Sequence, residues 1–185
     1  MRIRLAELAS GAEVLAGALA GRRLFTKLVG HLPTADVTAV CFLDFDGVSV
    51  ATSSFLRESV VAFRDYCRTQ RTRIYPMLVN LADEVHEELD FFLRRTNDAM
   101  LVCSLTKGGR SSGVRILGEL DEKAQFAFEA VKELGETDAA TLHEKFSKTE
   151  SVTITAWNNR LSGLSSRGLL IEEQRGRSKI YRTLL

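Results

Sequence analysis

The chain has 185 residues, a formal net charge of +1 and 45% hydrophobic residues, which is enough for one domain or two small ones with filled cores. The chain has only two prolines and lacks low-complexity runs, which argues against long disordered regions. Its apolar runs are all shorter than the roughly 20 residues of a membrane-spanning helix. The near-zero charge also excludes a chain that is basic throughout, so a nucleic-acid partner requires a local basic surface.

Strand and helix patterns alternate along the first half of the sequence. Residues 1–5 fit a short strand, and residues 13–32 fit a helix that the Gly21 region is expected to interrupt. Residues 37–45 form an unbroken apolar run, typical of a strand buried on both faces. The further elements expected in chain order are a helix over 54–69, a strand over 73–81, a helix over 82–95 capped by Asn80, and a strand over 99–105. This order predicts an α/β fold with a mainly parallel sheet and covering helices.

A Gly/Ser-rich segment, Lys107–Gly113, is the expected domain boundary. A segment this short fits a flexible joint or a hairpin turn. It lacks the Gly-Lys-Ser/Thr ending of a phosphate-binding P-loop. We therefore expect one domain over residues 1–113 and a second over 114–185. Residues 114–117 fit either a last strand of the first domain or the start of the second.

The second domain is expected to contain three helices followed by a β-hairpin. The helices cover residues 121–134, 138–146 and 154–167, with Thr137 and Thr153 as the caps of the second and third. Gly168 supplies a left-handed residue after the third helix. Strands over 169–174 and 179–184 then pair around residues 175–178. From Ser151 to Leu185 the basic residues are Arg160, Arg167, Arg175, Arg177, Lys179 and Arg182, against two acidic residues, Glu172 and Glu173.

Two groups of polar side chains in this domain are candidate DNA contacts. On the third helix, Trp157, Leu161 and Leu164 share the face expected in the core. The other face carries Thr155, Asn158, Asn159 and Arg160. Asparagine can pair with adenine, and arginine with guanine or phosphate. The hairpin adds Arg175, Arg177 and Lys179 as candidates for phosphate or minor-groove contact. The alternative is that both groups are ordinary solvated surface.

The C-terminal part, residues 119–185, resembles the winged helix–turn–helix transcription regulators of bacteria. The resemblance depends on the register of Trp157, Leu161 and Leu164, on Gly168-Leu169-Leu170, and on the Arg175-Gly176-Arg177 turn. It implies that the third helix lies in the major groove of double-stranded DNA while the hairpin, or wing, touches the flanking backbone.

The N-terminal part, residues 1–105, resembles the STAS-like domain family of unknown function, which is related to bacterial anti-sigma-factor antagonists. The matching segments are 43–48, 52–58 and 79–81. In the antagonists a serine at the start of the helix after this strand is phosphorylated by a partner kinase. The resemblance places that role on Ser53 or Ser54. Their position before a helical pattern predicts, as the alternative, that they cap the helix. The chain has Thr52 where the family usually has Asp, and Phe55 where Gly follows the serines.

No group of residues in the sequence forms a catalytic or metal-binding pattern. Three cysteines without metal-ligand spacing are typical of reduced thiols in a cytoplasmic protein. Asp44 and Asp46 near a strand end lack a neighbouring histidine or third acid, and Asp44 is interpreted as an acceptor that stabilises its loop. We therefore expect no catalytic residue, no metal and no cofactor.

These observations favour a cytoplasmic, non-enzymatic transcriptional regulator. Its winged helix would bind double-stranded DNA, and its STAS-like domain would sense a signal, dock a protein or dimerise. A homodimer is expected because one small module makes few phosphate contacts. The alternative is a protein-interaction switch, phosphorylated at Ser53 or Ser54, whose winged helix docks a protein instead of DNA.

Overall fold

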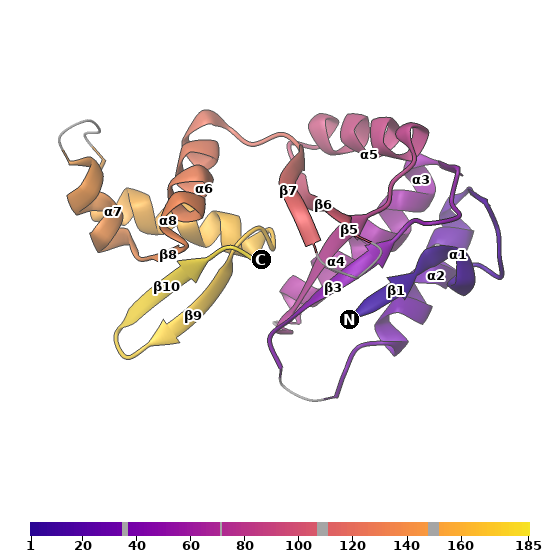
Figure 1. The fold of residues 1–185 in the computed structure, drawn as a ribbon, viewed down its shortest axis with the longest axis horizontal. Coiled ribbons are helices and arrows are strands. Elements are labelled where there is room, and N and C mark those ends of the chain that lie inside the picture. The colour runs from indigo at the N-terminus through magenta and orange to yellow at the C-terminus, as the bar shows by residue number, and fades with distance from the viewer. Residues whose placement is uncertain (35–36, 71, 107–110, 148–151) are drawn as a thin grey trace. The chain divides into compact units, whose positions relative to one another are not determined.

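A computed structural model describes residues 1–34, 37–70, 72–106, 111–147 and 152–185 of the chain (Figure 1). The chain forms two compact units, Met1–Glu119 and Leu120–Leu185. Each unit is described by itself below.

The first unit is built on a five-stranded sheet with the order β1-β3-β5-β6-β7. The first four strands are parallel, and β7 runs antiparallel to β6. Parallel neighbours need long crossovers, and helices fill each of them. The strands of this sheet are β1 (Arg2–Arg4), β3 (Ala39–Asp44), β5 (Ile74–Val79), β6 (Ala99–Leu105) and β7 (Ser111–Gly118), and a separate pair joins β2 (Val14–Leu15) to β4 (Val50–Ala51). The expected α/β fold with a mixed sheet and covering helices is confirmed.

Helices of the first unit pack on this sheet around an apolar core. β5 is buried along its whole length, as its continuous apolar sequence predicts. Three of these helices contribute, among other side chains, the fully buried Leu28, Phe63 and Leu89 to the core. The helices are α1 (Leu5–Leu8), α2 (Ala18–Gly30), α3 (Ser53–Leu56), α4 (Ala62–Thr69) and α5 (Asp83–Arg95), with a π-helical turn, η1 (Arg57–Val61), between α3 and α4.

Gly21 does not interrupt the helix around it, contrary to the expectation from sequence. α2 runs through Gly21 without a break, and the polypeptide before it forms β2 instead of a first helical turn. A Cβ atom at position 21 would lie 2.7 Å from the carbonyl oxygen of Phe55. The glycine therefore allows close packing of α2 against α3.

Asn80 does not cap α5, and this expectation was wrong. The N-cap residue of α5 is Ala82, which offers no side-chain hydrogen bond. Asn80 has a left-handed backbone conformation with φ of 56°. Its side-chain amide donates to the Asp44 carboxylate over 2.7 Å. The asparagine thus connects the ends of β3 and β5 instead of starting a helix.

The strand β7 moves the boundary between the units from residue 113 to residue 119. Its pairing with β6 assigns residues 114–117 to the first sheet. Gly118 ends the strand at φ of 92°, a region that favours glycine. Of the expected joint, residues 107–110 lie outside the described residues, and residues 111–113 begin β7.

The described residues of the second unit form three helices and a three-stranded sheet of order β8-β10-β9. Its elements are α6 (Glu122–Leu134), β8 (Glu136–Thr137), α7 (Ala139–Phe146), α8 (Ile154–Ser166), β9 (Ile171–Arg175) and β10 (Ser178–Arg182). The three helices and the hairpin expected from sequence are confirmed. The cap of α7 differs, because Asp138 accepts from the Thr141 amide while Thr137 belongs to β8.

Candidate nucleic-acid interface

The helix α8 is anchored on one face and open on the other. Thr153 caps it by accepting a hydrogen bond from the Ala156 amide. Trp157 and Leu161 are fully buried, and the indole lies 5.8 Å from the Phe126 ring and 5.9 Å from the Phe146 ring, measured between centroids. Asn158 and Asn159 are exposed. The predicted division of this helix into a core face and a polar face is confirmed.

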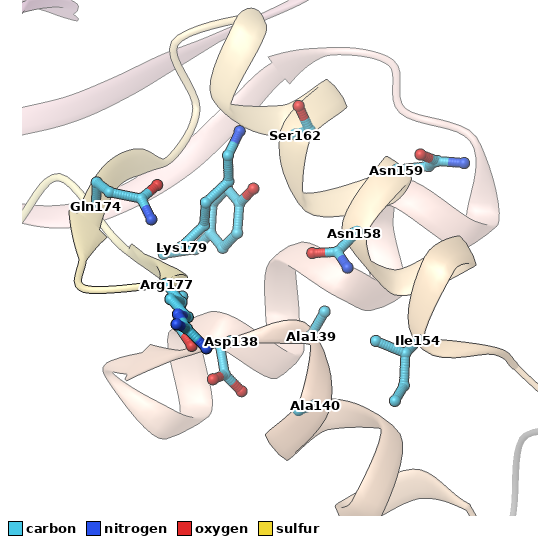
Figure 2. Close-up of a pocket in the computed structure, with 12 residues that line it drawn as sticks. Asp138, Ala139, Ala140, Ile154, Asn158, Asn159, Ser162, Gln174, Arg177 and Lys179 are labelled. Atoms are coloured by element: carbon cyan, nitrogen blue, oxygen red, sulfur yellow. The ribbon is translucent and has the colours of Figure 1, made fainter.

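The open face of α8 forms one wall of a groove, and the β9–β10 hairpin forms the opposite wall. This α8–hairpin groove has a volume of about 520 Å³. Figure 2 shows Asn158 on the helix facing the space in front of Arg177 and Lys179, with the start of α7 closing one end. The residues that line it are Asp138, Ala139, Ala140, Ile154, Asn158, Asn159, Ser162, Gln174, Arg177, Ser178, Lys179 and Tyr181. A single concave surface thus holds amide groups and two cations.

Ion pairs with neighbouring carboxylates hold most of the cations of the hairpin. Arg175 makes two 2.9 Å hydrogen bonds to Glu136, one to each carboxylate oxygen. Lys179 lies 2.8 Å from Glu172. Arg175 lowers the pKa of Glu136, first by hydrogen bonding and then by its charge, which favours the ionised carboxylate. Arg177 at the turn has no ion-pair partner among the described residues.

A second concavity lies on the other side of α8, facing the start of α6. This α6–α8 cleft is lined by Asp121, Lys123, Ala124, Asn159, Arg160, Gly163, Leu164 and Arg167 and has a volume of about 270 Å³. Arg160 is half-buried there, with its guanidinium 5.0 Å from the centroid of the Trp157 indole. The predicted contact residue Arg160 therefore lies away from the hairpin.

The structure brings only some of the predicted DNA contacts together. Asn158, Asn159, Arg177 and Lys179 share the α8–hairpin groove, whereas Thr155, Arg160 and Arg175 do not line it. Two cations that the sequence did not single out as candidate contacts, Lys123 and Arg167, line the α6–α8 cleft with Arg160. The acidic segment around Lys123 gives no local signal for it, and Arg167 contributes only to the basic charge of the C-terminal segment.

In the first unit, Ser53 and Ser54 lie at the start of the helical run that follows β4. Thr52, not either serine, caps this helix by accepting from the Phe55 amide. The Ser53 backbone amide donates to Glu88 over 2.8 Å, and its hydroxyl donates to the same carboxylate oxygen. The Ser54 hydroxyl lies 3.2 Å from the Thr52 hydroxyl. A phosphate on Ser53 would therefore face an existing carboxylate.

We expect the Ser53–Glu88 contact to give a measurable pH dependence of stability. The two hydrogen bonds from Ser53 lower the pKa of Glu88 below its ordinary value of 4.5. Because the folded pKa is lower than the unfolded one, this contribution is present at neutral pH and is lost as the pH falls through the folded value. Glu88→Gln should lower the free energy of unfolding by about 1 kcal/mol at neutral pH.

Urea denaturation of the wild type and Glu88→Gln across acidic and neutral pH checks this expectation. The difference between the two proteins should shrink as the pH falls. Ser53→Ala, which removes one of the two donors, should give an intermediate loss. A difference that stays constant down to acidic pH would show that the Glu88 charge is not involved.

Asp44 is a fully buried carboxylate at the end of β3. It accepts 2.7 Å hydrogen bonds from Arg2 and Asn80 and a 3.0 Å bond from the Asp46 amide. The bond to the Asp46 amide confirms the interpretation that Asp44 stabilises its own loop. Among the residues that the structure describes, no three His, Cys, Asp or Glu side chains are grouped as metal ligands.

The comparisons with known proteins give no family assignment. No protein-family model matches the chain, and no curated protein matches it. Within the described residues, every helix is too short or too polar to cross a bilayer.

Proposed function

We propose that the protein is a DNA-binding transcriptional regulator in which residues 120–185 act as a winged helix. The main support for this proposal is the α8–hairpin groove, which is lined by exposed Asn158 and Asn159 together with Arg177 and Lys179. Amide side chains read base edges in the major groove, and cations in a neighbouring wing contact phosphates. The STAS-like first unit would sense a signal, dock a protein or dimerise.

The order of elements in the second unit supports this proposal. The capped helix α8 packs on an aromatic cluster and is followed by a basic two-stranded hairpin. Together they present one polar helix face and one turn for contact with a duplex. One such module makes few phosphate contacts, so we propose that two copies bind together. Sedimentation of the protein with and without duplex DNA tests the dimer.

The salt dependence of DNA binding tests the proposed function. We expect the full-length protein to bind a mixed-sequence duplex with an affinity that falls steeply as salt rises, because bound phosphates release counterions. Arg177→Gln removes one cation that has no carboxylate partner among the described residues. It should reduce the slope of log affinity against log salt by about 0.9. Fluorescence anisotropy at several salt concentrations measures this slope.

The Arg175–Glu136 pair provides a matched control. The double variant Glu136→Gln/Arg175→Gln leaves the net charge unchanged and removes a cation whose charge is already neutralised. Its salt slope should stay close to that of the wild type. If the wild type binds no DNA at low salt, the proposed function is overturned. If Arg177→Gln leaves the slope of log affinity against log salt unchanged, the hairpin does not contact the DNA phosphates.

The neutralised hairpin favours a second candidate function. Because Arg175, Lys179 and Arg182 are each paired with a glutamate, the hairpin presents a surface of mixed charge, which suits a protein partner. In this function the second unit docks a protein, and phosphorylation regulates the first unit. Ser54 is the better acceptor of the two serines because Glu88 faces Ser53. Failure to bind DNA at low salt would favour this candidate.

A further inference from the structure

The basic side chains of the second unit divide into two groups. Ion pairs hold Lys132, Lys145, Arg175, Lys179 and Arg182. Among the described residues of 120–185, the basic side chains outside ion pairs are Lys123, Arg160, Arg167 and Arg177. All of these except Arg177 line the α6–α8 cleft. Among the described residues of this unit, the unpaired positive charge is therefore concentrated on the side of α8 away from the hairpin.

Like charges gathered in one cleft repel one another, and such a cleft focuses a positive potential that attracts anions. The carboxylate that lines this cleft, Asp121, accepts a 2.9 Å hydrogen bond from the Ala124 amide as the cap of α6. None of the three cations is within ion-pair distance of it. Arg160 is held in place by its contact with the Trp157 ring. The cleft thus offers three cations with free hydrogen-bond donors, of which Arg160 is held against an aromatic ring.

We propose that the α6–α8 cleft binds a backbone phosphate of DNA through Lys123, Arg160 and Arg167, on the strand opposite the one that the hairpin contacts. This inference rests on the proposed function. Asn159 lines both the α6–α8 cleft and the α8–hairpin groove, so α8 separates the two surfaces. A helix about 10–12 Å wide fills a major groove about 12 Å wide, and a phosphate backbone then lies along each of its sides.

The double variant Lys123→Gln/Arg167→Gln tests this site and leaves Arg160 on its aromatic support. We expect its affinity for a mixed-sequence duplex at low salt to fall by about tenfold or more, and its salt slope to decrease by nearly two. Lys132→Gln/Lys145→Gln is the matched control, because it removes the same charge from side chains that line neither concavity. Its slope should remain near that of the wild type.

The charge-preserving variant Lys123→Arg/Arg167→Lys separates the loss of charge from a loss of folding, and it should retain the wild-type slope. Helix content and the thermal midpoint of each variant give an independent check of folding. A wild-type slope in Lys123→Gln/Arg167→Gln, together with a reduced slope in Arg177→Gln, would overturn the phosphate site and leave the proposed function standing. A wild-type protein that binds no duplex at low salt would overturn both.

Discussion

Replacing Asp98 with alanine is expected to lower the free energy of unfolding of the first unit by about 3 kcal/mol. Arg64 on α4 is 5% exposed, and its guanidinium donates to both carboxylate oxygens of Asp98 and, over 2.9 Å, to the Ala99 carbonyl. Without Asp98 the guanidinium stays buried and loses its main counter-charge. The contact with Asp65 remains, which places the loss at the lower end of the range for a broken buried pair.

Replacing Arg64 should lower the free energy of unfolding by less than replacing Asp98. The difference between the two variants tests whether the loss in Asp98→Ala comes from an unpaired buried charge. Asp98 keeps 21% of its side chain exposed and also accepts a 2.8 Å hydrogen bond from the Ala99 amide. In Arg64→Met the carboxylate can therefore be hydrated, and the methionine refills the apolar volume. Equal losses in Asp98→Ala and Arg64→Met would contradict the explanation from desolvation.

The single tryptophan of the chain allows this effect to be assigned to one unit. Trp157 belongs to the second unit, so its fluorescence reports the unfolding of residues 120–185. In Asp98→Ala, the fluorescence transition in urea should keep its wild-type midpoint. The far-UV circular dichroism of the same samples should show an additional, earlier transition from the first unit.

Replacing Trp157 with alanine is expected to lower the free energy of unfolding of the second unit by about 3–5 kcal/mol. The indole is fully buried against Phe126 and Phe146 and also supports the Arg160 guanidinium. Small domains have little stability in reserve, so most of the second unit should unfold. Hydrogen exchange should show lost protection over α6, α7 and α8 and retained protection over β3, β5 and β6.

Trp157→Phe is the matched control because it keeps an aromatic ring in the same cluster. Its loss of stability should be smaller than that of the alanine variant, and α8 should stay protected from exchange. Retained protection over α8 in Trp157→Ala would show that the aromatic cluster does not hold the helix in place.

The face of α8 could be predicted from sequence because its determinants are local. Thr153 is a capping residue directly before a helical pattern, and Trp157, Leu161 and Leu164 recur at helical spacing. The hairpin followed from turn residues between two strand patterns, and Gly168 adopts the expected left-handed conformation with φ of 77°. Gly21 shows where such local reasoning fails, because a residue that weakens an isolated helix was required by packing against Phe55.

Periodicity and caps act within a few residues, so the sequence alone was enough to predict the main strands and helices, the buried face of α8 and the exposure of its asparagines. It did not predict β2 and β8, which form by pairing with distant strands. The folded chain was needed to show that β7 joins the first sheet, that glutamates pair with Arg175 and Lys179, and that Lys123 and Arg167 line one cleft with Arg160. Strand pairing and ion pairing join residues far apart in the chain. A sequence therefore gives the number of charges but not which of them remain free for a partner.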